Sequence, residues 1–379
     1  MKVDSGRSLA LDFFRGCAML IIVVDHIGGS ILSRFTLHRF AFSDAAEAFV
    51  FLSGFAIASA WLKWSEKGTA TASWRLLGRI WPIYRGFLVC SGLMLACAAV
   101  FQRLDISAPN LPVASLAALS GAPLTYIVDL LLLKHQPYLA SVLPMYLMFL
   151  LMAPLAIPLG LRRPVLALVL SIAAWGLAQA GPGVQGVPVW LSSFNSAIDS
   201  GEWSFNPLAW QCMFMLGVIG RSAFIRDVGA RIYLRRGLTL IAIGVVLGCA
   251  AWRLWVEPGY LNGALKENLS MLRVGNFVAL AWVCAQLSQT FWFKQMIQRL
   301  QWVAVVGRHS MACFIAGAVI SLVLDSILFR ATGGILDYPA GLFTDGVALL
   351  LTALCGLAFD KGFARRRRQP AMAKPVGLA

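Results

Sequence analysis

Long runs of apolar residues recur along the chain and are separated by short polar segments. A helix needs roughly 20 mostly apolar residues to cross the hydrocarbon core of a bilayer, and each run is close to that length. The runs are 9–33, 43–62, 80–102, 138–160, 164–180, 207–223, 237–256, 271–289, 307–329 and 341–359. The pattern predicts an all-α, polytopic integral membrane protein with about ten transmembrane helices.

Three segments depart from this pattern. Within 100–137, the apolar stretch from Leu124 to Lys134 is too short to span, and we expect an interfacial or re-entrant segment. Residues 181–206 are rich in Gly, Pro and Ser and contain two tryptophans, as a lid or vestibule wall would. Residues 360–379 are expected to form a basic, disordered cytoplasmic tail. No repeat and no pair of inverted halves is visible, which predicts one transmembrane domain over 1–379.

Composition supports a membrane protein and argues against other classes. The chain is 59% hydrophobic and 13% charged, whereas soluble domains have about 45–50% apolar and about 25% charged residues. The eight cysteines all fall within apolar runs and show no CxxC pairing. We interpret them as helix-packing residues, and expect neither disulfides nor a metal site.

The net charge of +15 predicts an orientation rather than a nucleic-acid partner. Basic residues lie in short loops, and no basic stripe or nucleic-acid motif is present. With the N-terminus inside, 22 Lys and Arg residues fall on the inner side and six on the outer side. By the positive-inside rule, both termini are predicted to be cytoplasmic. No cleavage site follows the first run, so we expect it to be retained as a span.

The first run, LDFFRGCAMLIIVVDHIGG (11–29), is unusually charged for a span, with Asp12, Arg15, Asp25 and His26. At 100° per residue, Arg15 and His26 would point the same way, about 16 Å apart along the helix axis. Asp12 would lie on the same side. A charge at mid-bilayer costs a few kcal/mol even on insertion scales, so this stripe is expected to face a hydrated or protein-lined cavity.

The stripe also has explanations without function. An i,i+3 ion pair between Asp12 and Arg15 near the inner interface is one. A neutral His26 hydrogen-bonded to a neighbouring helix is another. Asp25 would point about 100° away from His26, so we expect it to act through its field or through another group.

The motif SDAAEAFVFLSG (43–54) opens the second run with Asp44 and Glu47. A helix cap explains both acids, because their carboxylates satisfy backbone amides of the first turn. Alternatively, they lie at the outer mouth near His26, where Glu47 orients the imidazole or binds hydroxyl groups of a substrate. The two interpretations are compatible.

Three arginines occur with two tryptophans in WRLLGRIWPIYRG (74–86): Arg75, Arg79 and Arg85. Interfacial anchoring explains this composition. A site for a ligand with phosphate groups and an aromatic ring explains it as well, because arginine makes bidentate phosphate contacts.

Aromatic and amide side chains gather at the predicted outer ends of two further runs. They are Tyr138, Tyr146, Asn206, Trp210 and Gln211. Contact with a polar ligand and an interfacial aromatic belt are both consistent with them.

Several motifs, in order and spacing, resemble the acyltransferase family 3 membrane proteins, and within them the OpgC branch, the succinyltransferases of osmoregulated periplasmic glucans. The motifs are LALDFFRG, VVDHIGG, FAFSDAAEAFVFLSGFAIA, QPYLASVLPMYLMFLLMAP, SFNPLAWQCMFMLG and GRHSMACFIAG. The resemblance covers nearly the whole chain. The family hallmark is an arginine, ten intervening residues and a histidine, which here is Arg15 to His26.

The resemblance implies acyl transfer from cytoplasmic succinyl-CoA to hydroxyls of a periplasmic glucan in a bacterial inner membrane. Histidine suits the role of general base near neutral pH. No covalently bound cofactor is implied, and a homodimer is compatible with this reading. The candidate catalytic residues are His26, Asp25 and Glu47. The candidate acyl-CoA residues are Arg15, Asp12, Arg75, Arg79 and Arg85. The candidate acceptor residues are Asp44, Tyr138, Tyr146, Asn206, Trp210 and Gln211.

Two alternatives stay open at this point. One keeps acyl transfer but uses an acetyl donor or another envelope polysaccharide as acceptor. The other is a sugar or lipid-linked transporter, which intramembrane acids favour and the missing internal repeats disfavour.

Overall fold

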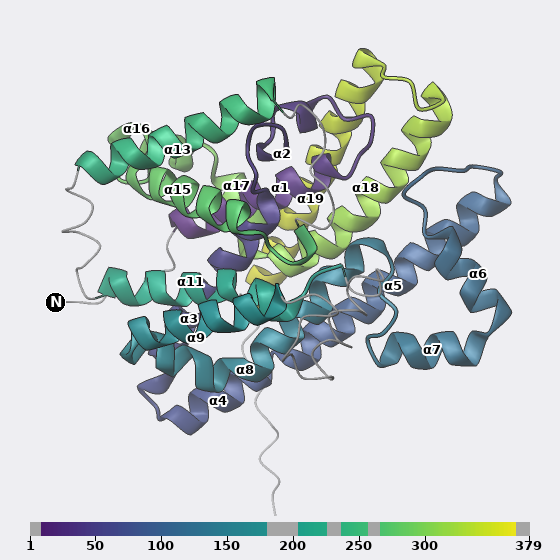
Figure 1. The fold of residues 1–379 in the computed structure, drawn as a ribbon. Helices are drawn as coiled ribbons and strands as arrows, with labels where there is room; N and C mark the ends of the chain where they lie inside the picture. Colours follow the sequence, from purple (N-terminus) through teal and green to yellow (C-terminus); the bar gives the residue numbers. More distant parts are fainter. Residues whose placement is uncertain (1–8, 180–203, 226–235, 257–265, 369–379) are drawn as a thin grey trace, which may run out of the picture.

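The computed structural model describes residues 9–179, 204–225, 236–256 and 266–368, and every regular element in these ranges is a helix (Figure 1). The helices are α1 (Leu9–Asp25), α2 (Leu37–Phe40), α3 (Ala45–Ser65), α4 (Thr69–Leu77), α5 (Ile80–Arg103), α6 (Val113–Gly121), α7 (Pro123–Leu131), α8 (Val142–Arg162), α9 (Pro164–Ala178), α11 (Pro207–Ile225), α13 (Arg236–Trp255), α15 (Met271–Leu287), α16 (Phe291–Arg299), α17 (Gln301–Arg308), α18 (Ser310–Thr332) and α19 (Tyr338–Arg368). Short 3₁₀ turns occupy Leu32–Phe35 and Tyr138–Ser141. Most of the 181–206 loop and the end of the basic tail lie outside the described residues.

A helix lies at each of the ten positions where a span was predicted. Among the described residues, six stretches are long and apolar enough to cross a membrane; they contain α3, α4 with α5, α8, α13, α18 and α19. A seventh results if α15 and α16, which meet at 88°, form one broken span. The helices α1, α9 and α11 are not among them. The all-α, multi-pass membrane architecture is confirmed, whereas the orientation stays a prediction.

The first helix ends at Asp25, so the predicted continuous helix over 9–33 is wrong beyond that residue. Gly28 and Gly29 follow three and four residues later, and glycine disfavours a helix interior. Two hydrogen bonds stabilise the turn: Thr36 Oγ1 donates to Asp25 Oδ1, and the Gly28 amide donates to Asp325 of α18. His26 therefore lies one residue beyond the helix.

Helix α1 lies inside the bundle, against α17, α18 and α3 (Figure 1). Two glycines allow its backbone to touch that of α17. A Cβ atom on Gly16 would overlap the Val303 carbonyl oxygen, and one on Gly307 would overlap that of Asp12. This close approach places the first helix beside residues from the last third of the chain.

The two largest hydrophobic clusters among the described residues lie on different sets of helices. One is formed by α3, α8, α9 and α11, with Trp210 and Met213 at its centre. The other joins α1 and α5 to α18, with Met19 and Phe87 fully buried. The helices α6 and α7 stand at the edge of the bundle (Figure 1). Each has nine residues, which agrees with the expectation that 100–137 contains a segment too short to span.

Candidate functional site

The predicted cytoplasmic end of α1 carries Arg15, which is half-buried. Its Nη2 donates a hydrogen bond to Ser310 Oγ at 2.6 Å, and its guanidinium lies 6.0 Å from the centre of the Phe49 ring. One turn earlier, Asp12 is buried and lies 3.9 Å from Arg308 Nε. The first helix thus presents a cation and an anion to α17 and α18.

A second set of charges lies at the same end. Asp360 of α19 accepts hydrogen bonds from Arg308 Nη1 at 3.0 Å and from His309 Nε2 at 3.1 Å. Arg308 is therefore shared between Asp12 and Asp360. These contacts join three helices around the first turns of α1.

The opposite end of α1 carries His26. Its Nδ1 lies 2.6 Å from the Ile22 carbonyl oxygen, which can only accept, so Nδ1 carries the proton. In the neutral ring, Nε2 is then the basic nitrogen. Charged or titratable groups that act electrostatically on this ring include Lys266, Asp44 and His38. The imidazole lies where the start of α3 and the segment before α15 meet.

Asp44 and Glu47 form the capping box expected from their spacing. Asp44 Oδ1 accepts from the Ala46 amide at 2.8 Å, and Glu47 Oε2 accepts from the Asp44 amide at 2.9 Å. These bonds satisfy amides that a helix start leaves without partners.

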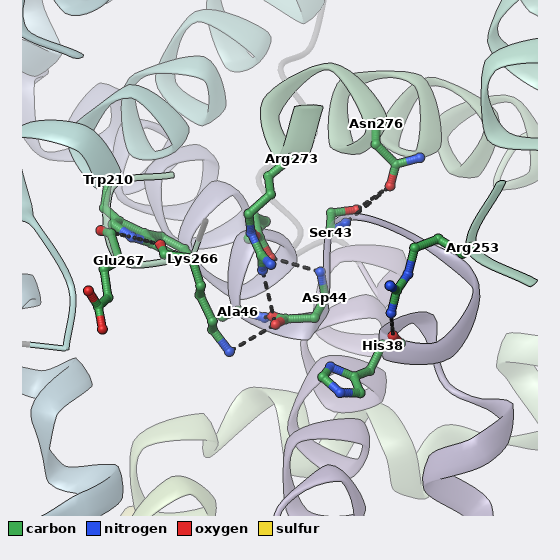
Figure 2. A network of polar contacts seen from close by, with 11 residues as sticks. His38, Ser43, Asp44, Ala46, Trp210, Arg253, Lys266, Glu267, Arg273 and Asn276 are labelled. Atoms are coloured by element: carbon green, nitrogen blue, oxygen red, sulfur yellow. Dashed lines mark hydrogen bonds and ion pairs between the residues drawn. The ribbon is translucent and has the colours of Figure 1, made fainter. Parts of the chain in front are cut away.

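The same two acids are paired with two cations, and Figure 2 shows Asp44 between Arg273 and Lys266. Arg273 Nη2 lies 3.0 Å from Asp44 Oδ2, and Arg273 Nε lies 2.5 Å from Glu47 Oε1. Lys266 Nζ lies 2.8 Å from Asp44 Oδ2. Glu47 is fully buried and Arg273 is 2% exposed, whereas about a third of the Lys266 side chain is exposed. We call these four residues the ion-pair cluster.

The hypothesis that Glu47 or Asp25 holds the imidazole of His26 is not supported by the hydrogen bonds of these two carboxylates, which go to other groups. Both Glu47 oxygens are used, one by Arg273 and one by the Asp44 amide. Asp25 accepts instead from Thr36 Oγ1 at 2.7 Å. Among the described residues neither carboxylate hydrogen-bonds His26; in the bonds that the structure describes, the ring is oriented by its own backbone.

Two further contacts border the ion-pair cluster (Figure 2). Ser43 donates from its amide and hydroxyl to Asn276 Oδ1, at 3.2 and 2.8 Å. Arg253 of α13 is buried and donates to the His38 carbonyl oxygen at 3.3 Å. Burial lowers the pKa of the His38 imidazole, so this side chain is neutral at pH 7. Cations from α13 and α15 therefore surround the segment between α1 and α3.

Two predicted acceptor residues at the start of α11, Asn206 and Trp210, instead bind the segment that carries Lys266. Trp210 is fully buried, and its Nε1 donates to the carbonyl oxygens of Lys266 and Glu267 at 3.0 and 3.1 Å (Figure 2). Asn206 Nδ2 donates to Asn268 Oδ1 at 2.8 Å. These bonds hold the segment that carries Lys266.

Gln211 and Tyr146, predicted to contact the acceptor, also make interhelical bonds. Gln211 exchanges hydrogen bonds with Ser171 of α9. Tyr146 is buried, and its hydroxyl lies 3.4 Å from Ser53 Oγ. The side chain of Tyr138 lies outside the described residues.

Unlike Arg15, the three other arginines predicted to bind CoA, Arg75, Arg79 and Arg85, are exposed. Arg79 lies over the Trp64 ring at 4.7 Å and Arg85 over the Trp81 ring at 5.7 Å. Stacking of this kind agrees with interfacial anchoring. The role of these residues, including Arg75, in CoA binding stays a prediction.

Sequence reasoning missed several residues of the site, among them Lys266, Asn276, Asp325 of α18 and Asp345 of α19, which accepts hydrogen bonds from the Ile31 and Leu32 amides. The two aspartates carry a signal, because an acid within an apolar run is rare and usually functional. Lys266 and Asn276 carry none, since their partners are distant in the sequence. Within the described ranges, no three His, Cys, Asp or Glu side chains are grouped as a metal site requires.

Comparison with known proteins adds one finding. The family model described as OpgC protein matches residues 7–361, almost the entire chain. No curated protein and no solved structure matches the chain significantly. The match extends over both ends of α1, the ion-pair cluster and every described helix up to the last turns of α19. The chain therefore belongs to the OpgC family and is a multi-pass membrane acyltransferase of the OpgC type.

Proposed function

We propose that the protein transfers a succinyl group from cytoplasmic succinyl-CoA to hydroxyls of osmoregulated periplasmic glucans, in a bacterial inner membrane. Family membership supports the reaction class. The observation that carries the assignment of residues is the placement of Arg15 in the first half of α1 and of His26 one residue beyond its last turn, eleven residues further along the chain. In this arrangement, the extended acyl-CoA enters from the cytoplasmic side past Arg15, and the acceptor enters from the periplasmic side to reach His26.

In this proposal, His26 Nε2 accepts the proton of the attacking sugar hydroxyl. The hydroxyl oxygen bonds to the thioester carbonyl carbon, the C–S bond breaks, and the CoA thiolate leaves and takes up the proton from His26. The bond from Nδ1–H to Ile22 keeps Nε2 as the basic nitrogen throughout. Arg15 binds the CoA moiety or stabilises charge that develops on the carbonyl oxygen.

The ion-pair cluster supports an acceptor site at the other end. Lys266 is the most exposed cation in it, and Asp44 offers a carboxylate beside it. Sugar hydroxyls bind well to such alternating donors and acceptors. Asp25 is bonded to Thr36 and contributes by fixing the turn after α1.

The test is turnover by purified protein in nanodiscs, with succinyl-CoA and glucan supplied and free CoA thiol measured. His26→Ala should abolish transfer, while Thr352→Ala, a buried change remote from His26 in sequence and bonded only within its own helix, should not. Full turnover by the folded His26→Ala variant would refute the assignment.

Mass spectrometry of glucans from cells with and without the protein identifies the acyl group. Loss of a succinyl increment supports the proposed donor. Loss of an acetyl increment instead would replace succinyl-CoA by acetyl-CoA and leave the assignment of His26 standing.

A further inference from the structure

Two buried carboxyl groups hold the segment that follows His26. Asp325 of α18 accepts a hydrogen bond from the Gly28 amide, with its Oδ1 at 2.7 Å. Asp345 of α19 accepts from the Ile31 and Leu32 amides, with its Oδ2 at 2.9 and 2.8 Å. Asp325 is 4% exposed and Asp345 is fully buried.

The two carboxyl groups differ in their second oxygen. Asp325 Oδ2 accepts from Asn110 Nδ2 at 2.9 Å, which adds the chain between α5 and α6 to the arrangement. Asp345 Oδ1 has no hydrogen-bond partner among the described residues. Replacing Asp345 by asparagine would therefore remove no hydrogen bond, provided that the amide oxygen takes the place of Oδ2.

Packing confines the same segment. Leu328 of α18 lies so close to Gly29 that a Cβ atom there would require the leucine to move. Gly341 of α19 faces the Gly29 carbonyl oxygen at a distance that leaves no room for a side chain. The turn after His26 is thus seated between α18 and α19.

The position of the imidazole depends on this turn, because His26 lies outside α1. In residues 27–30, the backbone bonds that the structure describes are of the turn type: the Ile27 amide donates to the Val24 carbonyl oxygen and the Ser30 amide to that of Ile27. Glycine has few conformational restrictions, and two glycines follow within three residues. Hydrogen bonds from outside must therefore supply the order that the helix no longer provides.

We propose that Asp325 and Asp345 are positioning residues for His26, which they hold in place through the backbone amides of Gly28, Ile31 and Leu32. The inference rests on the proposed role of His26 as the base. Neither carboxyl group contacts the imidazole in a bond that the structure describes, so each acts through the turn. A displacement of about 1 Å at a reacting group can cost about 100-fold in rate.

The experiment compares kcat and KM for the acyl donor across matched variants in nanodiscs. Asp325→Ala and Asp345→Ala should lower kcat by about tenfold or more, with KM changed less than about threefold, because donor binding does not require the turn. Asp325→Asn and Asp345→Asn should recover most of kcat, since the amide oxygen accepts the same hydrogen bonds. Asn110 can turn its amide to face the asparagine at 325.

Control variants on the same helices separate positioning from general packing. Ser326 and Thr352 are fully buried and bond only to carbonyl oxygens of their own helices. Ser326→Ala and Thr352→Ala should keep the kcat of the wild type. Thermal unfolding monitors the fold of every variant.

Several outcomes would overturn the inference: wild-type kcat in both alanine variants, asparagine variants as inactive as the alanine variants, or equal losses in the controls. If the alanine variants do not fold, the kcat values of Asp325→Glu and Asp345→Glu test the inference, since these variants keep the carboxyl group but displace it by one methylene. They should lose kcat, and unchanged kcat refutes positioning. An active His26→Ala variant refutes the proposed function; inactive His26→Ala with fully active aspartate variants refutes only this inference.

Discussion

Replacing Glu47 by leucine should destabilise the protein, and replacing Arg273 by methionine in the same chain should restore much of the loss. Glu47 is fully buried and bonds the Arg273 Nε and the Asp44 amide. Removing its carboxylate leaves a buried guanidinium with Asp44 as its remaining acid. Removing both partners leaves no such uncompensated charge.

The magnitude follows from these bonds. Each hydrogen bond to a charged group contributes about 1.5–3 kcal/mol, and Glu47 makes two. Breaking one side of a buried ion pair typically costs about 3–5 kcal/mol, so we expect that range for Glu47→Leu and for Arg273→Met. Replacing both members by apolar residues is often close to neutral. The double variant should therefore be more stable than the sum of the single losses predicts, by at least about 2 kcal/mol.

The assay is a double-mutant cycle on denaturant-induced unfolding in detergent micelles, followed by circular dichroism. Arg308→Met serves as the control partner, because Arg308 contacts Asp12 and Asp360 at the other end of α1. Glu47→Leu and Arg308→Met should add within about 0.5 kcal/mol. If Glu47 and Arg273 also add within that margin, the ion-pair cluster does not stabilise the fold in the way the structure indicates.

Two further changes test the ends of α1. Arg15→Ala should lower kcat/KM for the acyl donor by about 100- to 1,000-fold if Arg15 stabilises developing charge. Ser310→Ala, which removes the hydroxyl that accepts a hydrogen bond from Arg15, should lower kcat/KM by about tenfold or less. Steady-state kinetics distinguishes the two variants, and equal losses would contradict a direct role of Arg15. Gly307→Ala should lower the unfolding free energy by about 3 kcal/mol, because its Cβ would overlap the Asp12 carbonyl oxygen. Gly244→Ala on α13, where a Cβ meets open space, should be neutral or stabilising by up to about 1 kcal/mol. Equal stability of the two glycine variants would argue against close packing of α1 on α17.

The helices were predictable because an apolar run of fixed length has few alternatives in a bilayer. The end of α1 was not, although Gly28 and Gly29 mark a break. Ile31 and Leu32 continue the apolar pattern past the glycines, so hydropathy alone extends the helix. The structure ends it because carboxyl groups from α18 and α19 take up the amides of the turn.

The partners of the site residues were not predictable for a different reason. Glu47 and Arg273 are separated by 226 residues, and nothing local to either specifies the other. The capping box was readable because its two members lie three residues apart. Asp325 and Asp345 were visible as acids in apolar runs, but their partners are backbone amides. Because every residue except proline carries a backbone amide, a sequence pattern does not specify which amides the two aspartates bind.

Helix α1 can meet α17 and α18 only after most of the intervening chain has been made. The bonds that fix the turn after α1 join residues 297 and 314 positions apart. At the usual pace of synthesis, about 5–20 residues per second, α17 is made roughly 15–60 s after Asp12 and Arg15. During this interval, α1 lies in the membrane or beside the insertion machinery without the contacts from Asp12 to Arg308 and from Arg15 to Ser310. A chain truncated before α17 would therefore leave both charged side chains without their contacts to Arg308 and Ser310.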